Sequence, residues 1–239
     1  MQNYLLYQAS GSIDQMNECQ YALLKYISLY NLKTPHTTSV VIFTDKPALF
    51  ESFSSFIENF EMKPPSSLSR FEMIKHVAEE YEGNLLFCDT DTYPIKSLEV
   101  LFKDLSDRKI YLYQENIKES LRTMIIGVNT SNKNILYDII KDEKLHDETQ
   151  LNPKLSDIKN AGLFFRHYRN LPEFKKLLQT FFTKTQEESV PNLIKAAHHF
   201  DAQQIQIDKE QYSTLPFYKK WFKNITGTGW SIKQYEKKF

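Results

Sequence analysis

The sequence predicts an α/β fold in which a doubly wound, mostly parallel sheet carries helices on both faces. Short apolar runs of strand length alternate with stretches of helical periodicity along most of the chain. One of these runs, residues 85–88, is evenly apolar, as is typical of a buried strand in the middle of a parallel sheet. Asp89 and Asp91 follow it directly. Ligands bind at the carboxyl ends of strands in such sheets, so these aspartates mark the predicted site.

The composition indicates one sizeable globular core and excludes several classes of protein. The chain has 239 residues, of which 41% are hydrophobic and 14% aromatic. Its 30 basic and 30 acidic side chains cancel, so no global field favours nucleic acid as a partner. The spacing of Cys19 and Cys88 indicates neither a disulfide framework nor a metal site. Without a signal sequence or an apolar run of about 20 residues, we expect a cytoplasmic protein.

The first half of the chain predicts two strand-and-helix units before the central strand. An aromatic and apolar run over residues 4–9 predicts a strand, and helical spacing over 14–30 predicts a helix of about four turns. A second apolar run over 40–43 predicts the next strand, and Pro47 occupies the position where a following helix would begin. A further helix over 70–81 leads into the central strand.

The second half continues the alternation. Strands are expected at residues 110–113, 124–128, 160–166 and 204–207. Helices are expected at residues 97–105, 134–144, 172–184 and 190–200. Residues 147–159 are polar and poorly periodic, so we expect a loop over the site there.

Residues 217–239 differ from the rest because lysines and aromatic residues are interspersed along them. We therefore expect a catalytic domain over residues 1–216 and a basic, aromatic tail over 217–239. The favoured arrangement of the tail is a helix that packs its aromatic side chains on the domain. The alternative is a peripheral contact with the inner face of an anionic membrane, with lysines near the head groups.

The aspartate pair suits a divalent metal. Side chains two apart on an extended segment point the same way, so Asp89 and Asp91 are expected to face one ligand. Their hard oxygen atoms suit Mg²⁺ or Mn²⁺. A calcium loop of the EF-hand kind is excluded because its glycine position would be Pro94 and its closing glutamate would be Val100. Aspartates that only cap a turn are the simpler alternative.

The run Asp89-Thr90-Asp91-Thr92 also resembles the nucleophile motif of phosphatases of the haloacid dehalogenase superfamily. That resemblance would make Asp89 the nucleophile and Asp91 the general acid and base. In that superfamily the motif follows the first strand and precedes a glycine. Here two strand-and-helix units precede it and Tyr93 follows it, and no later acidic pair at a strand end is suited to hold the metal.

The order of features along the chain resembles a glycosyltransferase of GT-A fold, most closely glycosyltransferase family 8 and its bacterial relatives. An apolar strand ends in Asp89-Thr90-Asp91, a helix bearing Arg70 precedes it, and the run Asn160-Ala161-Gly162 follows later. Looser matches are Tyr7-Gln8-Ala9-Ser10 and Val41-Ile42-Phe43-Thr44-Asp45. The resemblance spans roughly the first 200 residues, and the aspartate pair and the Asn-Ala-Gly run are its specific parts.

The resemblance implies a metal-dependent, hexosyltransferase-like enzyme that uses Mn²⁺ or Mg²⁺. It would transfer a sugar from a nucleotide-diphosphate donor, a UDP-sugar, to a glycan or lipid-linked acceptor. A retaining outcome and a setting in bacterial surface polysaccharide biosynthesis follow from the resemblance alone. A nucleotide- or sugar-binding domain that has lost catalysis is the alternative outside enzymes.

The resemblance also implies a set of metal ligands. Asp91 would ligate the metal directly, and Asp89 would share the metal or hold the ribose of the nucleotide. The family takes a third ligand from a late histidine that precedes a glycine, but the corresponding stretch here has Gly227 and Gly229 without that histidine. His198 and His199 are the nearest substitutes, and His198 is the expected ligand; surface or core histidines near a helix end are the alternative interpretation.

The resemblance also implies which residues bind the donor and which act in catalysis. Arg70 would face the diphosphate or the donor sugar, whereas Ala161 and Gly162 would let the backbone approach the sugar. The nucleotide would contact Gln8, Ala9, Ser10 and Asp45, and its phosphates a turn containing Gly227 and Gly229. The residues implied near the reacting sugar carbon are Glu187 and Glu188. Asn160, the third implied catalytic residue, would offer hydrogen bonds to the sugar hydroxyls. A charged helix start is the alternative interpretation of the two glutamates.

Overall fold

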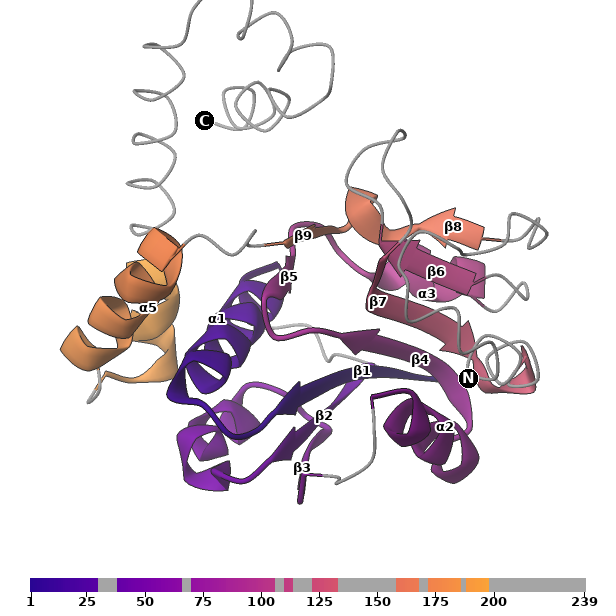
Figure 1. The fold of residues 1–239 in the computed structure, drawn as a ribbon, viewed down its shortest axis with the longest axis horizontal. Helices are drawn as coiled ribbons and strands as arrows, with labels where there is room; N and C mark the ends of the chain where they lie inside the picture. Colours follow the sequence, from indigo (N-terminus) through magenta and orange to yellow (C-terminus); the bar gives the residue numbers. More distant parts are fainter. Residues whose placement is uncertain are drawn as a thin grey trace, which may run out of the picture.

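A computed structural model describes residues 1–29, 38–65, 70–105, 110–113, 122–132, 158–167, 172–185 and 188–197 of the chain. Figure 1 shows a central sheet with helices on both of its faces. Several predicted features lie outside the described residues: the helix at 134–144, the strand at 204–207, the tail at 217–239, and most of the loop at 147–159.

The central sheet has seven strands in the order β3-β2-β1-β4-β7-β6-β8. Their bounds are β1 Gln2–Ala9, β2 Thr38–Thr44, β3 Phe60–Lys63, β4 Gly83–Cys88, β6 Ile110–Tyr113, β7 Arg122–Asn129 and β8 Ile158–Asn160. The pairs β1–β2, β1–β4, β2–β3 and β6–β8 are parallel. Strand β7 runs antiparallel to both of its neighbours, β4 and β6. The predicted α/β class with a mostly parallel sheet is confirmed.

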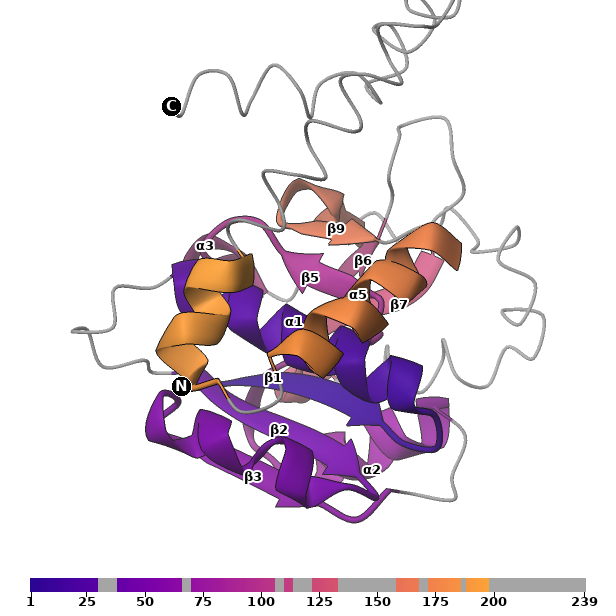
Figure 2. The same ribbon diagram turned by 90° about the vertical axis from the view of Figure 1, so that its left-hand side faces the viewer.

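Helices cover both faces of this sheet, as predicted. Helix α1 (Ile13–Leu29) and helix α3 (Glu99–Leu105) lie on one face, and α2 (Arg70–Glu80) lies on the other (Figure 1). Helix α5 (Pro172–Lys184) packs on the outside of α1, and residues 190–197 form a further helix (Figure 2). None of the helices in the described ranges has the length and apolar character needed to cross a membrane.

Two separate apolar cores result from the alternation of side chains along the strands. In β1, Leu5 and Tyr7 belong to the core that includes α1, α3 and α5. Leu6, between them, belongs to the core that includes Met73, Ile74 and Val77 of α2. Strand β4 is buried along its whole length, because it lies between these two cores.

The order of the strands defines where a ligand would bind. The chain adds β2 and β3 on one side of β1 and then places β4 on the other side. The topological switch point therefore lies between β1 and β4. Tyr7 of β1 pairs with Cys88 of β4, and Ala9 pairs with Thr44 of β2. The segments that follow these three strands consequently meet at one edge of the sheet.

Three local predictions were wrong. Strand β3 was not predicted, because it has only four residues and carries the charges of Glu61 and Lys63. The helix expected at Pro47 is instead two short 3₁₀ helices, η1 (Pro47–Leu49) and η2 (Glu51–Ser55). The end of the expected loop, residues 158–159, belongs to strand β8.

The strand expected at residues 160–166 is also different in the structure. Strand β8 ends at Asn160, whose side-chain oxygen accepts a hydrogen bond of 2.7 Å from the Gly162 amide and caps the 3₁₀ helix η5 (Ala161–Leu163). The chain then forms β9 (Phe165–His167), which pairs antiparallel with β5 (Thr92–Pro94) in a second, two-stranded sheet. The capping by Asn160 thus divides one predicted strand into two.

A buried asparagine network ties the amino end of β4 to its neighbours. The side-chain Nδ2 of Asn84 donates to Asn3 Oδ1 at 2.9 Å and to the Phe102 backbone carbonyl at 3.1 Å. Asn84 Oδ1 in turn accepts from Asn129 Nδ2 at 2.7 Å. Asn84 and Asn129 are only 3% and 2% exposed, so these hydrogen bonds replace contacts with water.

Replacing Asn84 by alanine is expected to lower the free energy of unfolding by about 2–3 kcal/mol. The change leaves the Asn129 amide and the Phe102 carbonyl buried without this partner. The midpoint of urea unfolding measures the effect. Asn192→Ala is the matched control, because Asn192 is exposed and donates only to Glu188 among the contacts in the described part of the chain. Equal midpoints for the two variants would contradict the prediction.

Candidate active site

The two aspartates lie on a tight turn at the carboxyl end of β4. The Asp89 amide donates to the Met124 carbonyl of β7 at 2.8 Å. The Asp89 carbonyl accepts from the Thr92 amide at 3.0 Å and from Thr92 Oγ1 at 2.7 Å. We call residues 89–92 the Asp turn. The bond from residue 92 back to residue 89 closes a β-turn, so the prediction of an extended segment at residues 89–91 was wrong.

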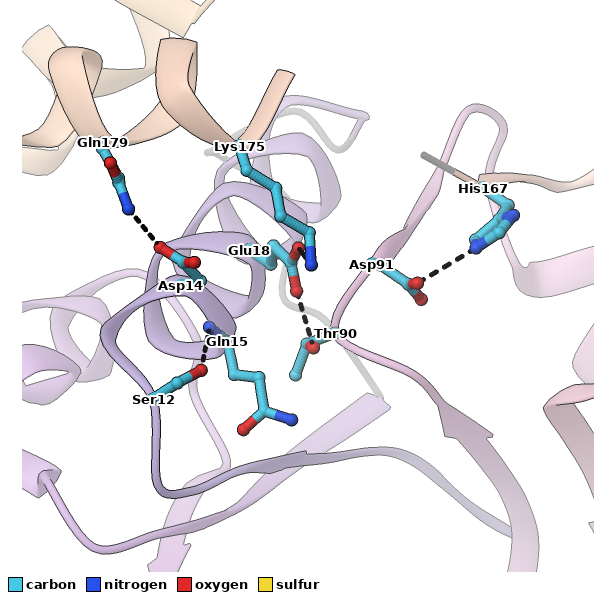
Figure 3. A network of polar contacts seen from close by, with 9 residues as sticks. All are labelled: Ser12, Asp14, Gln15, Glu18, Thr90, Asp91, His167, Lys175 and Gln179. Carbon is cyan, nitrogen blue, oxygen red and sulfur yellow. Dashed lines mark hydrogen bonds and ion pairs between the residues drawn. The ribbon is translucent and has the colours of Figure 1, made fainter. Parts of the chain in front are cut away.

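The Asp turn directs Thr90 and Asp91 to different partners (Figure 3). Asp91 Oδ2 lies 3.0 Å from His167 Nε2, and the side chains are 27% and 9% exposed respectively. His167 comes from β9, where it pairs with Thr92 of β5. Asp91 Oδ1 is buried and has no hydrogen-bond partner within the described ranges. One oxygen of Asp91 is therefore fixed by His167, and the other is a buried carboxylate oxygen without a partner among the described residues.

Thr90 points to the opposite side, where Glu18 of α1 lies (Figure 3). Thr90 Oγ1 donates to Glu18 Oε2 at 3.2 Å, and Lys175 Nζ of α5 lies 3.6 Å from Glu18 Oε1. The Glu18 side chain is 5% exposed and that of Lys175 is 40% exposed. Burial raises the pKa of Glu18; Lys175 and the Thr90 hydrogen bond act against this shift, whereas the charge of Asp91 adds to it.

The residues expected to hold the nucleotide lie together at the same edge of the sheet. The Gly11 amide, just after β1, donates to Asp45 Oδ2 at 3.2 Å, and Asp45 follows β2. Gln8 and Ser10 are half-buried, whereas Asp45 is exposed. Ala9 is fully buried. The loop after β1 and the end of β2 are thus joined beside the strand that leads to the Asp turn.

Residues 160–162 lie on the other side of the Asp turn and are linked to it through the small sheet. The Phe164 carbonyl, directly after η5, accepts from the Ile95 amide at 2.8 Å, just beyond β5. Ala161 is fully buried. The Asn160 side-chain oxygen is engaged by the Gly162 amide, as described above. The structure therefore connects the Asn-Ala-Gly run to the strand pair that carries His167.

The other predicted site residues either are not joined to the Asp turn by the contacts above or lie outside the described residues. Glu188 is exposed and accepts from Asn192 Nδ2 at 2.7 Å, just before the helix at 190–197, which favours the helix-start alternative for this residue. The backbone of Arg70 begins α2, the connection between β3 and β4. Glu187, His198, Gly227 and Gly229 lie outside the described residues. Within the described ranges, no group of three or more histidine, cysteine, aspartate or glutamate side chains is placed to hold a metal.

The sequence interpretation missed the two side chains that hold the Asp turn, Glu18 and His167. Both carried a signal. Glu18 is a carboxylate on the apolar stripe of a helix, where an unpaired charge is costly. His167 follows the apolar run at residues 163–165 after one intervening residue, Arg166, a pattern similar to the one that drew attention to Asp89.

Comparison with solved structures identifies the class of fold. The crystal structure of the glycosyltransferase GlyE from Streptococcus pneumoniae TIGR4 matches with a TM-score of 0.54 and 11% sequence identity, over 84% of this chain and 64% of that chain. Its apo form matches with the same TM-score and 8% identity, over 85% of this chain and 64% of that chain. The chain thus spans less than two thirds of the length of GlyE. No protein-family model matches the chain, and no curated protein matches it in sequence. The likeness confirms the GT-A fold.

Proposed function

We propose that this protein is a metal-dependent glycosyltransferase of hexosyltransferase-like activity. It transfers a sugar from a nucleotide-diphosphate donor, a UDP-sugar, to a glycan or lipid-linked acceptor. The observation that carries the proposal is the Asp turn, which places two carboxylates at the switch point of a GT-A sheet. The loop after β1 and Asp45 lie at the same edge, where the nucleotide is expected.

The side chains of the Asp turn fit a divalent cation. Asp91 Oδ1 is a buried carboxylate oxygen without a partner in the described part of the chain. Asp89, at the start of the Asp turn, is half-buried. Hard oxygen atoms of this kind suit Mn²⁺ or Mg²⁺. The cation, when bound, would neutralise negative charge that develops on the diphosphate leaving group. His198 is the proposed third protein ligand.

The other residues of the site would bind and orient the donor. Gln8, Ala9 and Ser10, together with Asp45, would hold the nucleotide base and ribose. Arg70 would contact the diphosphate, since a guanidinium matches phosphate oxygens with two parallel hydrogen bonds. The turn at residues 160–162 would line the sugar, where the absence of a side chain at Gly162 allows close approach of the backbone.

The two alternative functions are not favoured. In the phosphatase motif the nucleophilic aspartate follows the first strand of the core, whereas here Asp89 follows β4 in a GT-A fold. Asp91, which would be the general acid and base of a phosphatase, is instead bound to His167. A binding domain without catalysis would have the same nucleotide site, so only turnover distinguishes it from a transferase.

Thermal unfolding with ligands tests the proposal. UDP and Mn²⁺ together are expected to raise the melting temperature, since a ligand present at about 100 times its dissociation constant adds about 2.7 kcal/mol to stability. UDP with a chelator is expected to have much less effect. No response to any nucleotide with metal would rule out the transferase. Hydrolysis of an aryl phosphate that is lost in Asp89→Asn would favour the phosphatase.

A further inference from the structure

We propose that Glu18 is a positioning residue that fixes the Asp turn through its hydrogen bond with Thr90. The proposal rests on the proposed function, because it assigns Glu18 to the support of the carboxylates that would bind the metal. Glu18 lies on α1, whereas the Asp turn follows β4, and 72 residues separate Glu18 from Thr90 in the sequence. The contact therefore holds the turn from a different element of the fold.

The geometry places Glu18 and His167 on opposite sides of the same turn (Figure 3). His167 fixes Asp91 Oδ2, and Glu18 fixes the hydroxyl of Thr90, the residue between the two aspartates. Thr90 is 7% exposed, so its hydroxyl has little access to water as a substitute partner. A turn held from both sides keeps its backbone in place, so the carboxylates that it carries lose less conformational freedom when they bind a cation.

A carboxylate in this place is costly, which argues against a purely passive role. The Glu18 side chain is 5% exposed, and burial raises its pKa, as does the nearby charge of Asp91. Lys175 offsets part of this cost from α5 at 3.6 Å. An uncharged side chain at this position would have a lower desolvation cost on burial than the glutamate has. The acceptor oxygen that Glu18 presents to Thr90 gives a specific reason for a polar residue there.

The competing interpretation is that Glu18 only docks α5 on α1 through Lys175. A second contact joins the same two helices without touching the Asp turn: Gln179 Nε2 donates to Asp14 Oδ1 at 2.6 Å. Gln179→Ala therefore removes a polar contact between α1 and α5 and serves as the matched control. Glu18→Ala and Thr90→Val each remove the hydrogen bond to the turn, one from each partner.

The test compares these variants of the full chain with Glu18→Gln, which keeps an acceptor oxygen. Titration calorimetry measures binding of UDP in the presence of Mn²⁺, and amide hydrogen exchange measures the opening of residues 88–93. Glu18→Ala and Thr90→Val are each expected to weaken UDP binding about tenfold, the size found when supports of metal ligands are removed. Both variants should also speed amide exchange at the Asp turn. The double variant should show little more effect than either single variant, and Glu18→Gln should retain most of the UDP affinity that Glu18→Ala loses.

Gln179→Ala is expected to bind UDP and exchange as the wild type does. The proposal is overturned if Thr90→Val, the less disruptive variant, binds UDP and exchanges like the wild type. It is also overturned if Gln179→Ala shows the same losses as Glu18→Ala, since helix docking would then account for them. If the wild type itself binds no UDP with Mn²⁺, the proposed function fails. Exchange at residues 88–93 in the single and double variants then supports or overturns the positioning role by itself.

Discussion

Asp91→Asn is expected to reduce kcat/KM for the nucleotide-sugar by about 10²–10³-fold while leaving the protein folded. Asparagine has nearly the same shape, and its side-chain oxygen can still accept from His167 Nε2. The change removes the negative charge and puts an amide group in place of Oδ1, the carboxylate oxygen that has no partner among the described residues. The site would thereby lose its main attraction for a divalent cation.

Two measurements make this prediction specific. Steady-state transfer with a panel of UDP-sugars gives the activity, and thermal unfolding with UDP and Mn²⁺ gives the binding. Asp104→Asn is the control, because Asp104 also accepts a hydrogen bond, from the Tyr111 hydroxyl, but lies on α3 outside the site. If UDP still stabilises the Asp91→Asn variant in a metal-dependent way, Asp91 is not a metal ligand.

Gly83→Ala is expected to lower the free energy of unfolding by about 3 kcal/mol. Gly83 begins β4 with φ of 142°, a conformation that residues with a side chain rarely adopt. A Cβ atom there would lie 2.1 Å from the Gln2 carbonyl oxygen of β1, so one backbone segment must move. For a chain of this size the loss corresponds to a fall in melting temperature of about 6–12 °C.

Gly11 provides a control that separates the two causes. Gly11 also has a positive φ, of 87°, but a Cβ atom there would be 4.0 Å from the nearest atom, Gln15 Oε1. Gly11→Ala therefore adds the backbone strain of a positive φ without a clash, and we expect it to cost about 1 kcal/mol. Equal losses for the two variants would show that the approach of Gly83 to Gln2 is not what requires glycine.

Elements with a strong periodic signal could be predicted from the sequence. Helix α5 and strand β6 have the predicted bounds, and α1, α2, β1, β2 and β4 lie within a few residues of them. These elements have apolar faces that must be buried, so their pattern is largely independent of the rest of the chain. The direction of β7 and the short edge strand β3 depend on pairing with distant segments. The local sequence pattern of β7 or β3 does not indicate which strand each one pairs with.

The site was predicted in part, for a related reason. The carboxylates of the Asp turn follow an apolar strand, and the fold places Gln8, Ser10 and Asp45 at the same edge. These residues lie at or just beyond the carboxyl ends of β1, β2 and β4, and a local pattern can show where a strand ends. Glu18 and His167 have their roles because α1 and β9 pack beside the turn, and contacts between distant segments cannot be predicted from local periodicity.

The support of the Asp turn by α1 and β9 also affects the order in which the protein reaches its active state. His167 and Asp91 are 76 residues apart, and Gln179 and Asp14, which join α5 to α1, are 165 apart. Contacts between such distant segments require the closure of long loops, which slows folding. The pairing of β1 with β4 closes a loop similar to that of the His167–Asp91 contact, since Asn3 and Asn84 are 81 residues apart. Helix α5 docks over 165 residues, so β1, β2 and β4 can pair before α5 docks. We expect refolding protein to regain far-ultraviolet circular dichroism before it regains Mn²⁺-dependent binding of UDP.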